Sequence, residues 1–97
     1  MAKRLTAKEK KIQECERRMY LPHRTEADKS YYAGQIRVFR TDMDSTEDYA
    51  SVMNDAANWI NSDDINLRAK ACGIYSEVWP FSQRGHTQDY RFNKESA

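Results

Sequence analysis

The sequence is poor in the residues and spacings from which enzyme and metal sites are usually built. Only three glycines occur in 97 residues, which leaves little chain for a phosphate-binding glycine-rich loop or a nucleophile elbow. The cysteines, Cys15 and Cys72, and the histidines, His23 and His86, stand far apart, without the close cysteine spacing that is typical of zinc sites. We therefore expect no catalytic site, no metal and no cofactor.

Long apolar runs are also missing. No stretch approaches the roughly 20 apolar residues that span a membrane, and the basic residues 1–11 lack the apolar segment of a secretory signal. Two cysteines are too few for a disulfide framework, which favours a reducing compartment. The sequence thus predicts a cytoplasmic protein that does not contact a membrane.

Basic residues are absent from the middle of the chain, and around this gap the charges are sorted. Residues 1–40 carry eleven Lys and Arg against five Asp and Glu, whereas residues 41–67 carry seven acids and no base. Residues 68–97 carry five bases and three acids, so the net charge of +1 conceals a strongly dipolar chain. Because a surface sorted in this way attracts partners by the sign of their charge, it is typical of recognition.

Four polar start signals indicate four helices. Thr6, Thr25 and Ser45 each stand three residues before an acid, which is the spacing of a capping box. Ser62 is followed by two aspartates, whose negative charge suits the first turn of a helix. Apolar residues recur after each signal at intervals of three and four, as on one face of a helix. The pattern predicts helices over residues 7–20, 26–42, 46–61 and 63–79.

These four helices predict an all-α fold, a small antiparallel bundle. The connections at residues 42–45 and 61–62 are short, so neighbouring helices should run antiparallel. We expect a helical bundle domain over residues 1–81, followed by a polar, extended C-terminal tail over residues 82–97. Aromatic residues make up 11% of the chain, which is more than disordered sequences carry.

Two segments leave an alternative fold open. Residues 35–41 and 75–81 alternate well enough between apolar and polar side chains to form one short hairpin, which would make the fold α+β. Gly34 and Gly73 also weaken the helix prediction, because a glycine inside a helix costs about 1 kcal/mol relative to alanine. Close packing of helices would explain one of these glycines.

The first candidate surface is the basic N-terminal region, which could bind nucleic acid by neutralising phosphates. Glutamates such as Glu14 are interleaved with its bases, which favours a solvated helix face or a protein contact over nucleic acid. The bases concerned are Lys3, Arg4, Lys8, Lys10, Lys11, Arg17, Arg18, Arg24 and Lys29.

The second candidate surface is an acidic patch. The run from Asp42 to Asp48 begins like a calcium-binding loop, but Glu47 replaces the glycine needed at the sixth position and Met53 the glutamate needed at the twelfth. These acids are therefore expected to cap helices or to dock against a basic surface of a partner. The patch consists of Asp42, Asp44, Glu47, Asp48, Asp55, Asp63 and Asp64.

The third candidate surface lies near the C-terminus, where aromatic residues and arginines are concentrated. Such side chains dominate protein interfaces because they combine a large apolar area with a polar tip. The residues concerned are Phe81, Arg84, Tyr90, Arg91 and Phe92.

The sorted charge, the spare aromatics and the lack of catalytic motifs together predict a non-enzymatic protein-binding module. It would act stoichiometrically, as an adaptor or inhibitor of a larger complex, including complexes that process nucleic acid. Accessory proteins of phages and mobile elements that disarm host defences are of this type, which is an analogy of architecture only. Two alternatives stay open: a nucleic-acid-binding protein that uses the basic N-terminal region, and a homo-oligomer that sequesters a small anionic ligand.

Overall fold

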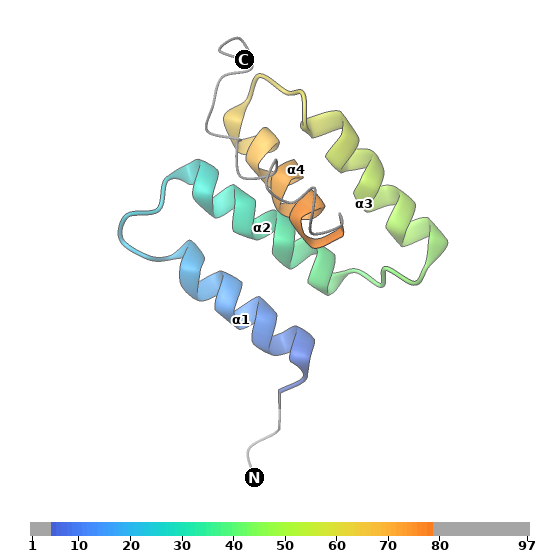
Figure 1. Ribbon diagram of the computed structural model, residues 1–97, viewed down its shortest axis with the longest axis horizontal. Helices are drawn as coiled ribbons and strands as arrows, with labels where there is room; N and C mark the ends of the chain where they lie inside the picture. Colours follow the sequence, from blue (N-terminus) through green and yellow to red (C-terminus); the bar gives the residue numbers. More distant parts are fainter. Residues whose placement is uncertain (1–4, 79–97) are drawn as a thin grey trace.

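Residues 5–78, which the computed structural model describes, form four helices arranged as a layered bundle (Figure 1). Helix α1 spans Ala7–Met19, α2 spans Glu26–Arg40, α3 spans Thr46–Trp59 and α4 spans Ile65–Val78. The prediction of an all-α bundle is confirmed. No described residue forms a strand: of the segments considered for a hairpin, residues 35–40 belong to α2 and residues 75–78 to α4.

The first two helices begin with the capping boxes that the spacing predicts. Thr6 Oγ1 accepts a hydrogen bond from the Glu9 N–H at 3.1 Å, and the Glu9 carboxylate accepts one from the Thr6 N–H at 3.1 Å. Thr25 and Asp28 form the same reciprocal pair at the start of α2. Each box satisfies two backbone donors that the first turn of a helix would otherwise leave without a partner.

The starts of the last two helices differ from this arrangement. Ser45 caps α3 with its hydroxyl alone. The prediction that α4 begins at residue 63 is wrong, since the helix begins at Ile65. The Asp64 carboxylate accepts a hydrogen bond from the Asn66 N–H at 2.9 Å, and Ser62 Oγ accepts one from the Asp64 N–H at 3.0 Å. Asp64 therefore caps α4 and precedes its first turn.

The helices do not pack in the order in which they follow one another in the chain. α2 and α4 form the centre of the bundle, α1 packs on α2, and α3 packs on α4. Figure 1 shows α1 and α3 at opposite edges of this arrangement. Consecutive helices run in opposite directions, as their short connections predict, whereas the central pair α2 and α4 runs in the same direction.

The central pair is held together at two buried glycines. A Cβ atom on Gly34 would overlap the carbonyl oxygen of Lys70 in α4, and a Cβ atom on Gly73 would overlap the carbonyl oxygen of Tyr31 in α2. Because neither position has a side chain, the two backbones lie in direct contact, close enough for Cα–H···O contacts. Close packing therefore explains both glycines inside helices.

The apolar core surrounds α4. Its larger cluster joins α2, α3 and α4 and consists of Val38, Val52, Ala56, Ala71, Ile74 and Tyr75. A smaller cluster consists of Ala27, Ala69 and Cys72. Although α4 is almost entirely buried between residues 69 and 76, neither it nor any other helix within residues 5–78 is long and apolar enough to cross a membrane.

A chain of hydrogen-bonded polar side chains connects α1, α2 and α4. The thiol of Cys15 in α1 donates a hydrogen bond to Oε1 of Gln35 in α2, with an S···O distance of 3.6 Å. Gln35 Nε2 donates to Ser76 Oγ in α4 at 3.0 Å, and Ser76 Oγ donates to the Gly73 carbonyl oxygen at 2.7 Å. The buried polar atoms of this chain are thus satisfied within the protein, as buried polar groups must be.

Replacing either central glycine by alanine is expected to destabilise the bundle. In an ordinary helix this change raises stability by about 1 kcal/mol, but here the new methyl group must push α2 and α4 apart, as in overpacked cores that lose about 1–3 kcal/mol. Gly34→Ala and Gly73→Ala should therefore lower the free energy of unfolding in urea. Ala50→Gly, at an exposed position of α3, is the control and should cost about 1 kcal/mol. A stabilised Gly34→Ala variant would contradict the close contact.

Cys15 is expected to resist alkylation in the folded protein. Burial raises the pKa of its thiol, and the negative charge of Glu77 acts in the same direction. Because only the thiolate is nucleophilic, less of the reactive form is present at neutral pH than for an exposed cysteine. We expect Cys15 to react with iodoacetamide more slowly in the native protein than in the urea-unfolded chain, as followed by peptide mass spectrometry. Equal rates in the two states would show that the thiol is accessible.

Candidate functional site: a cationic groove

The acidic patch is not gathered into one cluster. Asp42, Asp44, Glu47 and Asp48 lie exposed around the connection between α2 and α3 and the start of α3. The aspartates at residues 63–64 lie beyond the other end of α3, which at 14 residues is about 20 Å long. The patch is therefore a series of acids along the α3 edge of the bundle.

Asp55, the remaining acid of the patch, is turned towards α2. Its carboxylate forms an ion pair with Arg37 at 2.6 Å, and both side chains are about one-third exposed. It is thus an internal partner of a base and not a part of the exposed acidic edge.

The arginines at the end of α1 are occupied by a neighbouring glutamate. Arg17 and Arg18 both donate to the Glu14 carboxylate, at 2.5 Å and 3.1 Å. The hydrogen bond from Arg17, together with the charges of both arginines, lowers the pKa of that exposed carboxyl. This is the arrangement of a solvated helix face, stabilised by pairs three and four residues apart.

Most other bases of the N-terminal region also have partners. Arg24 donates to the Arg18 carbonyl oxygen at 2.9 Å and lies over the Tyr32 ring. Lys29 pairs with Glu26 at 3.6 Å, and Lys11 lies over the Phe39 ring. Lys8 and Lys10 differ from these bases: they are exposed and form neither an ion pair nor a contact with an aromatic ring among the described residues.

Several predicted site residues lie outside the described range of 5–78. They are Lys3 and Arg4 of the basic region and the whole C-terminal group, Phe81, Arg84, Tyr90, Arg91 and Phe92.

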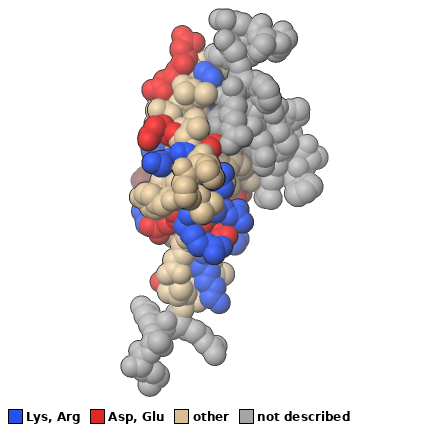
Figure 2. Space-filling model, turned by 90° about the vertical axis from the view of Figure 1, so that its left-hand side faces the viewer, with Lys and Arg blue, Asp and Glu red and all other residues tan. Residues whose placement is uncertain are grey.

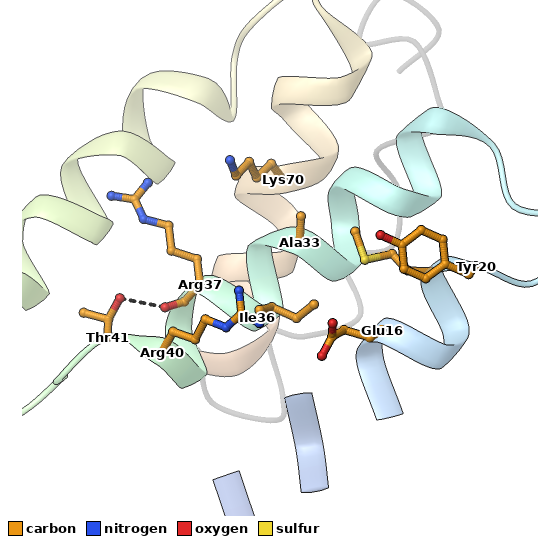
Figure 3. A pocket seen from close by; sticks show the side chains of 9 residues that line it. Glu16, Tyr20, Ala33, Ile36, Arg37, Arg40, Thr41 and Lys70 are labelled. Atoms are coloured by element: carbon orange, nitrogen blue, oxygen red, sulfur yellow. Dashed lines mark hydrogen bonds between the residues drawn. The ribbon is translucent and has the colours of Figure 1, made fainter. Parts of the chain in front are cut away.

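An open groove with a volume of about 420 Å³ runs along α2, between α1 and α4 (Figure 3). Its floor is a stripe of α2, in which Ala33, Ile36, Arg37 and Arg40 follow one another at helical spacing. One wall is formed by α1 and by the residue that follows it. The other wall is formed by α4, and the residue that follows α2 closes one end. The wall residues are Glu16, Met19, Tyr20, Lys70 and Thr41.

Three cations line this groove. In Figure 3 Glu16 on α1 stands across from Arg40, whereas the charged ends of Arg37 and Lys70 are turned towards α3. Arg40 is exposed, and neither Arg40 nor Lys70 forms an ion pair within the described chain. Glu16 is the one acid among the described residues that line the groove, so the lining carries an excess of positive charge.

Trp59 of α3 contacts two of these cations. The Arg37 guanidinium lies 5.6 Å from the centroid of the Trp59 ring, and Lys70 Nζ lies 5.2 Å from it. An aromatic face attracts cations through its quadrupole. Together with the carboxylate of Asp55, the ring therefore offsets part of the repulsion between Arg37 and Lys70.

A second, smaller hollow of about 290 Å³ adjoins the groove at the end of α2. It shares Arg37, Arg40 and Thr41 with the groove and has Asp42 and Asp48 in its lining. Its bases and acids are balanced in number, in contrast to the groove.

The groove is not predictable from the sequence, because its bases come from distant parts of the chain. The sequence does hold a signal for Arg37 and Arg40. Their spacing of three and four residues from Ala33 and Ile36 places all four side chains on one face of α2. Lys70 carries no such signal, since it reaches the groove only through the contact between α2 and α4.

The arrangement suits the binding of an anionic, partly apolar group. Guanidinium and ammonium groups bind carboxylate or phosphate oxygens, and Met19, Ala33 and Ile36 offer an apolar surface beneath them. Within residues 5–78 no group of three or more His, Cys, Asp or Glu is placed to hold a metal ion.

Removing the Asp55 carboxylate that pairs with Arg37 is expected to have a small effect on stability. Partly exposed ion pairs contribute at most about 1 kcal/mol, and Arg37 keeps its contact with Trp59. Asp55→Asn should therefore lower the free energy of unfolding by about 1 kcal/mol or less, whereas Asp44→Asn, at an exposed position, should leave it unchanged. A loss several times larger in Asp55→Asn, measured by urea denaturation, would show that the pair organises the bundle.

Comparison with known proteins assigns no family to this arrangement. No family model matches the chain, and neither a curated protein nor a solved structure matches it. The function must therefore be inferred from the residues of this chain.

Proposed function

We propose that this protein is a non-enzymatic binding module that acts stoichiometrically on another protein, as an adaptor or an inhibitor. The observation that carries the proposal is the groove, whose lining combines three cations, Arg37, Arg40 and Lys70, with apolar side chains and one acid, Glu16. Charged groups around an apolar centre are the usual composition of a protein-recognition surface. Two of the three cations have no carboxylate partner among the described residues and are available to one from outside.

The distribution of charge over the bundle supports recognition of a partner with sorted charge. α1, at one edge, carries five bases and three acids, whereas α3, at the opposite edge, carries three acids and no base. On the face shown in Figure 2, acidic side chains gather towards the upper end, and Lys and Arg lie mainly around the middle and below it, with some acids among them. Such a field orients an approaching partner and raises its association rate.

An aromatic side chain at the groove supplies the second half of the mechanism. Tyr20, the residue after α1, is 73% exposed and lines the groove, whereas Trp59 is half-buried and contacts Arg37 and Lys70 without belonging to the lining. Large aromatic contacts slow the dissociation of a complex, which is where most affinity is determined. Charge would thus direct the encounter, and the aromatic and apolar surface would retain the partner.

The wider biological setting follows by analogy alone. Small helical proteins that block a larger nucleic-acid-processing complex, as phage and mobile-element accessory proteins do to host defences, need the same properties. A cytoplasmic inhibitor of this kind is the setting that we propose.

A second candidate function, nucleic-acid binding, is supported by Lys8 and Lys10. They are exposed on α1 without an ion-pair partner in the described chain and could contact phosphates. Glu9, Glu14 and Glu16 on the same helix would repel those phosphates, which is why we place this function second.

The two functions predict opposite results in an affinity purification from the cells that produce the protein. The full chain is compared with Arg40→Gln/Lys70→Gln and with the control Lys8→Gln/Lys10→Gln, which removes the same charge from α1. We expect one protein to be recovered in a fixed molar ratio, to be lost with the first variant and to be kept with the control. Recovery of heterogeneous nucleic acid, lost at high salt and with the α1 variant, would contradict the proposal and favour the second function.

A further inference from the structure

The groove leaves one face of α2 without a helical neighbour among the described residues. α1 and α4 pack on α2 from two sides, and the stripe from Ala33 to Arg40 lies between them (Figure 3). This stripe spans two helical turns, about 10 Å. A stripe between two flanking helices offers ridges and grooves to another helix, and no strand edge for an extended peptide exists within residues 5–78.

The charges of the groove identify the chemistry of such a helix. Arg37 already binds one carboxylate, that of Asp55, at 2.6 Å. Arg40 and Lys70 have no carboxylate within the described chain, and they flank the stripe from α2 and α4. A partner with acidic side chains would complete both contacts.

The opposite wall determines how this partner lies. Glu16 stands on the α1 side of the groove and repels carboxylates, so the acidic side chains must face α4 and the end of α2. The floor at Ala33 and Ile36, with Met19 beside it, accepts an apolar side chain between Glu16 on one side and the cations on the other. The partner is therefore amphipathic, with acids on one flank of an apolar stripe.

We propose that the groove binds an acidic amphipathic helix of a protein partner, which lies along α2 with carboxylates on Arg40 and Lys70 and an apolar side chain over Ala33 and Ile36. This inference rests on the proposed function and names its partner by chemical class. It uses the mode in which a helix places its apolar face in a groove and charges at the rim fix its register. A nucleic acid fits less well, because a phosphate follows every nucleotide along the strand, whereas a helix can keep its acids on the flank that faces away from Glu16.

The proposal is tested with synthetic helical peptides of 14 residues. The probe carries two glutamates four residues apart and one leucine between them, on an alanine background. One control peptide has glutamine in place of both glutamates, and another has serine in place of leucine. Binding is followed by amide NMR shifts of the full-length protein, with inorganic phosphate and a single-stranded oligonucleotide as further probes.

The expected result is binding of the glutamate–leucine peptide with shifts at Ala33, Ile36 and Lys70. Arg40→Gln/Lys70→Gln should weaken this binding about tenfold, since two charge contacts are lost, while Lys8→Gln/Lys10→Gln should change it less than twofold. Asp55→Asn, which frees Arg37, should tighten it. Both control peptides should bind at least several-fold more weakly.

Other outcomes separate this inference from the proposed function. Equal binding of the peptide to the wild type and to Arg40→Gln/Lys70→Gln would overturn the inference, as would stronger groove binding of phosphate or of the oligonucleotide. A protein partner that is still recovered by the Arg40→Gln/Lys70→Gln variant would also overturn it, but would leave the binding function intact. Recovery of nucleic acid alone from cells would contradict the proposed protein-binding function, whether or not the peptide binds to the groove.

Discussion

The close approach of the α2 and α4 backbones at Gly34 and Gly73 is the constraint on which the rest of the bundle depends. It brings the backbones of α2 and α4 together in the same direction, although the two helices are separated by α3 in the chain. α1 and α3 then pack on the outer sides of this pair. The same contact carries Lys70 to the side of α2 that bears Arg37 and Arg40, so the groove is a product of the central packing.

The layer order also explains how charge that is sorted along the chain becomes charge that is sorted in space. A basic α1 and an acidic α3 lie at opposite edges because each packs on a different member of the central pair. Pairs within one element, such as Glu14 with Arg17 and Arg18, moderate this separation locally. The pair of Asp55 with Arg37 joins α3 to the basic side of the groove.

Local features of this fold were predictable from the sequence, and the long-range ones were not. The caps at Thr6, Thr25 and Ser45 and the spacing of apolar residues predict three helix starts correctly, because both effects act within a few residues. The cap at Asp64 was missed, since the neighbouring hydroxyl of Ser62 offers the same local chemistry. The groove could not be predicted from the sequence, because periodicity shows which face of α2 is apolar but not which helix covers that face.

The division between a closely packed centre and lightly constrained edges has a consequence for how such a protein can change. Small residues along α4, Ala69, Ala71 and Gly73, are confined by their neighbours. The outward positions of α1 and α3 are not confined in this way, since many of their side chains are exposed. Mutation can therefore alter the charges of the outer helices while the scaffold persists, so the surface of such a protein can diverge faster than its fold.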